Sequence, residues 1–292
     1  MKEFPIPLVA LGPGTHTEDE SLDYLPMPKD MDSYRPPVLP EPEELVGLDQ
    51  ARQALQQVLT LLERGGKGGA PGLVTLGVLG PRDFHVINQV LGEGETSAVV
   101  QLGAGNLEVR VQESVFAGVW RLMTWRNEEG REPVLVDDAI EVGPVPSLFA
   151  STAAEDVWKE HPTWQGALPP NVQNAPLLVE EIRDQVARWQ PGQVSHVVNL
   201  TLLPVTPEDI AFLDHHLGTG RVLMLARGYG NCRISNTRLS NCWRVVYYNS
   251  MDKVILNTVE VVAMPEVAMA APEDLRDSYE RLRDVMTWLE GA

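Results

Sequence analysis

Two cysteines, Cys232 and Cys242, are the side chains of this sequence best suited to metal or redox chemistry. A pair of thiolates can bind a soft metal ion or cycle between the dithiol and the disulfide. We expect the two residues on neighbouring strands around a turn near Thr237, where they could face each other. Their spacing is not an established zinc pattern, and two cysteines do not form a disulfide framework in a chain of 292 residues.

The adjacent histidines of the segment Asp214-His215-His216 are a second candidate for metal binding. Neighbouring residues of a helix point about 100° apart, and no further ligand lies three or four residues away. We therefore expect His215 to be exposed and His216 to be partly buried. The sequence contains neither a Gly-x-Ser-x-Gly elbow nor a His-Glu-x-x-His motif, so it indicates a non-enzymatic protein, and we expect no bound cofactor.

The chain contains an internal repeat, from about 75–154 and again from about 201–271. The segment LGEG at 91–94 returns as LGTG at 217–220, and the Trp-Arg pair at 120–121 returns at 243–244. A residue present in both copies builds the repeated unit, whereas a residue present in one copy is free to have another role. The repeat aligns Cys232 with Val109 and Cys242 with Val119, which favours two buried core cysteines over a metal or redox pair.

Several charged residues are duplicated at matching positions, which indicates helix caps or charge networks that belong to the unit. The matched pairs are Asp83 and Asp209, Arg110 and Arg233, Arg121 and Arg244, and Glu141 and Glu260.

The segment at 227–237 belongs to the second copy alone, since its counterpart at 104–108 lacks the aromatic residue and the arginine. Glycines flank a tyrosine close to an arginine, a composition that suits a recognition loop. The alternative is a tight hairpin turn with a packed tyrosine. The residues that we expect to contact a partner are Arg227, Tyr229, Asn231 and Arg233.

The hydrophobic pattern predicts an α+β fold made of two tandem, pseudo-symmetric repeats, each helix–strand–helix followed by a mostly antiparallel sheet. The expected divisions are a Pro-rich acidic leader (1–42), a first repeat (43–156), a linker (157–174) and a second repeat with a C-terminal helix (175–292). Helices are expected at about 43–63, 81–91, 175–189, 207–217 and 273–290. Strands are expected at 73–79, 97–102, 107–112, 115–125, 133–142, 197–203, 221–226, 231–235, 242–248 and 254–262.

The formal charge of −18 argues against nucleic acid or an anionic membrane as the main partner. No apolar run approaches the roughly 20 residues that span a bilayer, and the N-terminus lacks the features of a cleaved signal peptide. We therefore expect a cytoplasmic protein without membrane insertion.

Most of the chain resembles the HupH/HyaF family of hydrogenase expression and formation proteins, with the weakest likeness at 16–42 and 151–172. The segments that carry the resemblance are GYGNCRI at 228–234, WRV at 243–245, NTVEV at 257–261, PEV at 265–267, AAPEDL at 270–275, LGPGT at 11–15 and LGEGE at 91–95.

The resemblance implies an accessory protein in the maturation of membrane-bound, uptake-type [NiFe] hydrogenases. It implies a chaperone that holds the iron–sulfur small-subunit precursor before export and acts with a thioredoxin-like accessory protein. The family has no agreed catalytic residues that could be carried over to this chain. Two alternatives stay open: a scaffold that links other maturation factors, and a metal- or redox-handling protein that uses Cys232 and Cys242.

Overall fold

The computed structural model describes residues 48–77, 79–103, 106–128, 130–227 and 230–291. The expected leader, the first residues of the first predicted helix, and Tyr229 lie outside the described residues. The described chain forms two compact units. The copy-one unit contains the residues up to Ala150 together with those from Glu266 onward, and the copy-two unit contains residues 151–265.

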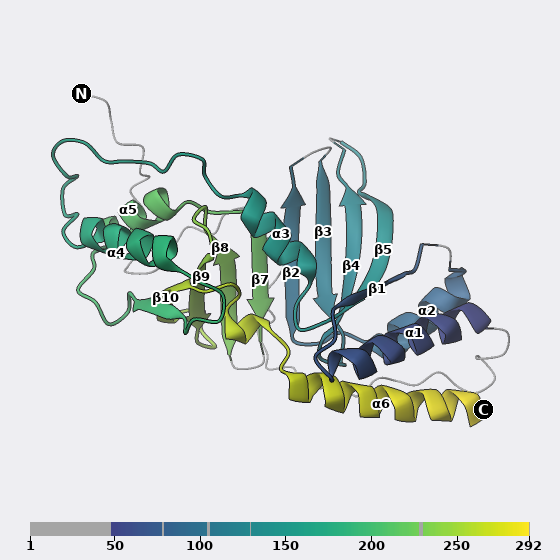
Figure 1. The fold of residues 1–292 in the computed structure, drawn as a ribbon. Helices are drawn as coiled ribbons and strands as arrows, with labels where there is room; N and C mark the ends of the chain where they lie inside the picture. Colours follow the sequence, from purple (N-terminus) through teal and green to yellow (C-terminus); the bar gives the residue numbers. More distant parts are fainter. Residues whose placement is uncertain (1–47, 78, 104–105, 129, 228–229, 292) are drawn as a thin grey trace. The chain divides into compact units, whose positions relative to one another are not determined.

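Each copy contains a helix, a strand, a helix and four strands in the same succession, and Figure 1 labels most of these elements along the ribbon. The elements of the first copy are α1 (Asp49–Gly65), β1 (Gly72–Thr75), α2 (Pro81–Leu91), β2 (Thr96–Leu102), β3 (Leu107–Glu113), β4 (Val119–Arg126), β5 (Val134–Val142) and α3 (Ser147–Glu155). Those of the second copy are α4 (Ala175–Arg188), β6 (His196–Asn199), α5 (Pro207–Leu217), β7 (Val222–Ala226), β8 (Asn231–Asn236), β9 (Cys242–Tyr248), β10 (Val254–Val261), η3 (Glu266–Ala268) and α6 (Pro272–Gly291).

The strands pair in the same order in both units. The order is β1-β5-β4-β3-β2 in the copy-one unit and β6-β10-β9-β8-β7 in the copy-two unit. All of these neighbouring strands are antiparallel. The expected class, helices combined with antiparallel strands, is therefore confirmed.

Helix α5 begins where the sequence places it, because Thr206 and Asp209 form a reciprocal capping box around Pro207. The Thr206 hydroxyl accepts the Asp209 backbone N–H, and the Asp209 carboxylate accepts the Thr206 backbone N–H. These bonds satisfy donors that the first turn of a helix otherwise leaves free.

The core of the copy-one unit includes the C-terminal helix. Leu275, Leu282 and Met286 of α6 belong to the same buried cluster as Leu55 and Leu62 of α1, and the two helices lie side by side in Figure 1. Residues 175–292, expected as one repeat, are therefore divided between two compact units. Helical periodicity shows that α6 has an apolar face, but it does not show which core that face enters.

The segment expected as a linker, 157–174, packs into the copy-two unit. Trp164 meets Phe212 of α5 edge to face, with ring centroids 6.1 Å apart. The Trp158 backbone N–H donates to the carbonyl of Arg238 at 3.0 Å. Val172 is buried in the core that α4 and α5 share with β6, β9 and β10.

Some expected boundaries differ from the structure. The strand expected at 115–125 begins only at Val119, because a turn closed by the Val119 N–H and the Phe116 carbonyl precedes it, with Gly118 at a φ of 79°. Strands β1 and β6 are shorter than expected, and α3 was not expected. Among the described residues, no helix has the length and apolar character needed to cross a membrane.

Candidate partner-binding site

Three of the four residues expected to contact a partner lie at one end of the copy-two sheet. Arg227 directly follows β7 and is exposed, and Asn231 is the first residue of β8. Ala226 pairs with Cys232, so the next position outward places Arg227 opposite Asn231. Arg233 follows two residues further along β8, on the same face as Asn231.

Arg233 is held against an aromatic ring. Its guanidinium carbon lies 5.6 Å from the centroid of the Tyr248 ring, and Tyr248 is the register partner of Asn231 on β9. The Arg233 Nε atom is buried and has no hydrogen-bond partner among the described residues. A buried donor of this kind is costly to leave unpaired.

The copy-one unit contains the same arginine–aromatic pair, but its arginine also has a carboxylate partner. The Arg110 guanidinium lies 5.3 Å from the ring centroid of Trp125, the register partner of Glu108. Arg110 Nε donates to Glu108 Oε1 at 2.6 Å, and Gln101 Nε2 donates to Glu108 Oε2 at 2.7 Å. The Glu108 carboxylate, which is buried, therefore joins both neighbours.

The two units differ at two positions of this shared arrangement. Asn231 takes the place of Glu108, and Arg227 takes the place of Gln101. In the copy-one unit, the charges of Glu108 and Arg110 cancel and Gln101 is neutral. In the copy-two unit, Arg227 and Arg233 carry two positive charges. The copy-two end is thus a cationic surface beside an aromatic ring, a composition suited to a partner with an anionic group.

Sequence reasoning found the arginines but missed Tyr248 and the lost carboxylate. The signal was present, since the shift that aligns Arg110 with Arg233 also aligns Trp125 with Tyr248 and Glu108 with Asn231.

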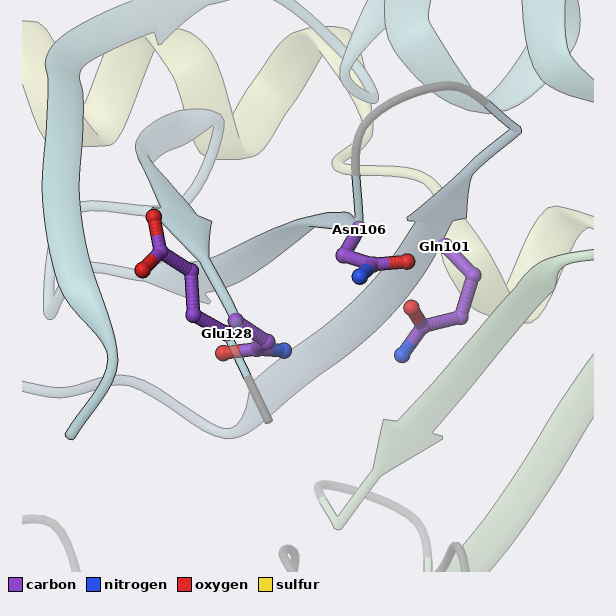
Figure 2. A pocket seen from close by; sticks show the side chains of 4 residues that line it. Gln101, Asn106 and Glu128 are labelled. Atoms are coloured by element: carbon purple, nitrogen blue, oxygen red, sulfur yellow. The ribbon is translucent and has the colours of Figure 1, made fainter. Parts of the chain in front are cut away.

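The corresponding end of the copy-one sheet contains a hollow of about 310 Å³ (Figure 2). Its lining residues are Gln101, Asn106, Asn127 and Glu128. The Oδ1 atom of Asn127 is buried and has no hydrogen-bond partner among the described residues. None of the four lining residues is cationic, so this hollow differs in charge from the copy-two end.

The two cysteines do not face each other. Cys232 pairs with Tyr247, whereas the Cys242 carbonyl accepts the N–H of Thr237 at the other end of the hairpin. Cys242 and Tyr247 are five positions apart on β9, which places the two thiols on opposite faces of the sheet, about 16 Å apart along the strand. The expectation that the cysteines could face each other is therefore wrong.

Each cysteine lies in an apolar environment, as the valines at the matching positions indicate. Both are 2% exposed. Burial raises the pKa of each thiol to about 12, so neither thiol is a ready thiolate near neutral pH. The described residues contain no group of three or more His, Cys, Asp or Glu that could hold a metal ion.

The two histidines of α5 have separate environments. His215 is exposed, while His216 is buried and stacks on Phe212 with ring centroids 4.0 Å apart. His216 Nδ1 lies 2.8 Å from the Phe212 carbonyl oxygen. Burial lowers the pKa of His216, which favours a neutral ring in a packing role.

The duplicated aspartates connect two helices in each unit, and Asp209 also caps α5, in line with the helix caps expected from the repeat. Asp209, at the start of α5, accepts the backbone N–H groups of Gln173, Asn174 and Ala175 at the start of α4, at 2.8–3.0 Å. Asp83 accepts the backbone N–H of Ala51 at 2.8 Å and so connects α2 to α1.

Taken together, the fold and this site define a tandem α+β repeat protein with a cationic surface on its second copy. Residues 49–167 and 172–289 each match the family described as HupH hydrogenase expression protein, C-terminal conserved region. The chain belongs to this HupH family of hydrogenase expression/formation proteins.

Several relatives are similar over nearly their full length. The chain is 48% identical over 291 residues to the hydrogenase expression/formation protein HoxQ of Cupriavidus necator, covering 99% of both chains. It is 41% identical to HupH of Rhodobacter capsulatus, covering 98% of both chains. It is 33% identical to the hydrogenase-1 operon protein HyaF of Escherichia coli, covering 97% of this chain and 96% of the relative.

Proposed function

We propose that this protein is a cytoplasmic, non-catalytic accessory protein in the maturation of a membrane-bound uptake [NiFe] hydrogenase. Its role is to hold the iron–sulfur small-subunit precursor before export, together with a thioredoxin-like accessory protein. The observation that carries the proposal is the similarity over almost the whole chain to proteins named for hydrogenase expression and formation.

The cationic end of the copy-two sheet is the proposed contact surface. Arg227 is exposed, Arg233 is held against Tyr248, and Asn231 lies between them in the register. Aromatic and arginine side chains are the residues that most often anchor protein–protein contacts. Tyr229 stays a predicted contact.

The charge of the whole chain supports a second, long-range contribution. A formal charge of −18 attracts a basic segment such as the twin-arginine signal of an exported precursor. Since the Debye length falls from about 10 Å at 0.1 M salt to about 3 Å at 1 M, this attraction weakens as salt is added.

A binding experiment with purified components tests the proposal. The chain is titrated with the small-subunit precursor that keeps its signal peptide, and with the mature subunit as the matched control, at low and high salt. We expect tighter binding of the precursor and weaker binding at high salt. Equal affinity for the two forms would contradict the precursor-holding role. An affinity that does not change with salt would contradict the electrostatic contribution.

A scaffold that joins other maturation factors is the alternative function. It predicts recovery of those factors with the tagged chain from cells that lack the small subunit. The proposed chaperone instead requires the small subunit for that recovery.

A further inference from the structure

The cationic end of the copy-two sheet has an internal counterpart that indicates what it binds. In the copy-one unit, one carboxylate accepts from Arg110 Nε and from Gln101 Nε2 at 2.6 Å and 2.7 Å. In the copy-two unit, the guanidinium and the aromatic ring are retained, but the carboxylate of Glu108 is replaced by the neutral amide of Asn231.

The charged residues around Asn231 also indicate an anionic ligand. Arg227 replaces the neutral Gln101 on the neighbouring strand position, and it forms no ion pair within the described residues. Arg233 Nε is buried without a hydrogen-bond partner among the described residues, whereas Arg110 Nε is paired. The register thus places two arginines beside the neutral Asn231, and this composition favours an anionic ligand.

We propose that an Asp or Glu side chain of the partner protein binds between Arg227 and Arg233 and takes the place that Glu108 occupies in the copy-one unit. The Tyr248 ring supports the Arg233 side chain from the β9 side, as Trp125 supports Arg110. This inference rests on the proposed function only in that the partner is a protein; the binding chemistry belongs to the chain itself.

The repeat supplies the decisive substitution. Asn231→Glu places the copy-one carboxylate beside Arg233 within the chain and so fills the site without removing either arginine. Asn231→Gln is the matched control, since it has the same length and no charge. Glu108→Gln is the control in the other copy, where no partner contact is expected.

The first test uses sodium acetate as the probe and the side-chain N–H signals of arginine in nuclear magnetic resonance spectra. Acetate, but not sodium chloride of equal ionic strength, should shift the Arg233 Nε–H signal and leave the Arg110 signal in place. Asn231→Glu should weaken the acetate response at least about tenfold more than Asn231→Gln does. An Arg233 signal that ignores acetate, or equal responses of the two variants, would overturn the inference.

The second test measures the affinity of the purified chain for the small-subunit precursor. Asn231→Glu should weaken binding at least about tenfold more than Asn231→Gln does, while Glu108→Gln should stay within about twofold of wild type. Failure of the wild-type chain to bind the precursor would contradict the proposed function and leave the acetate result standing. Unchanged binding by Asn231→Glu would contradict the carboxylate site and leave the proposed function standing.

Discussion

Arg121 and Arg244 occupy the same place in the two copies of the repeat, but each is paired with an acid on a different element. Arg121 of β4 forms a two-point ion pair with Asp138 of β5, with N···O distances of 3.0 Å and 2.9 Å. Arg244 of β9 lies 3.2 Å from Asp214 of helix α5. The arginine is thus common to both copies, whereas its acid lies on a strand in the copy-one unit and on a helix in the copy-two unit.

In each copy, the position that holds the acid in the other copy is occupied by an asparagine. Asn88 of α2 takes the place of Asp214 and hydrogen-bonds Arg121, and Asn257 of β10 takes the place of Asp138. At these two matched positions each unit therefore has one acid and one amide. The arrangement keeps one positive and one negative charge together in both copies, as a partly buried ion pair requires.

We expect Asp138→Asn to lower the free energy of unfolding by about 2–4 kcal/mol, because it leaves Arg121 without its carboxylate. Adding Asn88→Asp gives the copy-one unit the copy-two arrangement and should recover at least half of the loss. Urea unfolding of both variants measures the effect. A double variant no more stable than Asp138→Asn would show that the two acid positions are not equivalent.

Asp209→Asn should destabilise the copy-two unit by about 2–4 kcal/mol, because the fully buried carboxylate holds the starts of both helices. Burial opposes ionisation of Asp209, but the backbone N–H donors outweigh it and lower the pKa of the carboxyl. A lowered folded-state pKa gives stability that is present above the unfolded value of 3.8 and lost as the pH falls through the folded value.

The difference between wild type and Asp209→Asn should therefore be largest near neutral pH and shrink below about pH 4. Thermal unfolding between pH 3 and 7 gives the comparison. Asp184→Asn, which changes an exposed acid of α4, is the control and should cost at most about 0.5 kcal/mol. A difference that stays constant with pH would contradict the ionised role of Asp209.

Glu113→Gln should stabilise the copy-one unit as the pH rises. Burial raises the pKa of Glu113 to about 7, with a further contribution from the Glu95 and Asp274 carboxylates. A raised folded-state pKa means that wild type loses stability from the ordinary value of 4.5 up to about 7. Asn236, a neutral amide, has the same register position in the copy-two unit.

The measurement is urea unfolding at pH 5 and pH 8. Relative to wild type, Glu113→Gln should be more stable at pH 8 than at pH 5, by about 1–2 kcal/mol. Exposed Glu93→Gln should shift the two values equally. Parallel pH curves for Glu113→Gln and wild type would rule out a titrating Glu113.

The double variant Cys232→Val/Cys242→Val should fold and bind the small-subunit precursor as wild type does, because valines fill both positions in the other copy. We expect a stability change within about 1.5 kcal/mol, typical of a core exchange of similar volume. Native wild type should also react slowly with thiol reagents, since burial raises both thiol pKa values to about 12. Loss of precursor binding with the fold intact would instead support the alternative in which the two cysteines have a functional role.

Local signals in the sequence predicted the elements well. The Thr206-Pro207 start and the Leu217 end of α5 match the structure, because a capping box and a terminal glycine act over a few residues. The strand at 242–248 is likewise confirmed, since all of its residues except Arg244 are apolar or aromatic. The early start expected for β4 failed because the apolar residues at 115–116 continue the strand pattern into a turn.

Long-range relations were harder to predict. The packing of α6 on α1 depends on which core receives an apolar face, and periodicity carries no such information. The cysteine register depended on the position of the hairpin turn, where a shift of a few residues moves a side chain to the other face. The repeat was the better guide, because Val109 and Val119 indicated buried positions for both thiols.

The most direct test of the central claim is co-purification of the tagged chain from hydrogenase-expressing cells, followed by mass spectrometry of the bound proteins. We expect wild type to recover the small-subunit precursor with its signal peptide still attached, and Asn231→Glu to recover less of it than Asn231→Gln. Absence of the precursor, with other maturation factors still recovered from cells that lack the small subunit, would contradict the chaperone and support the scaffold.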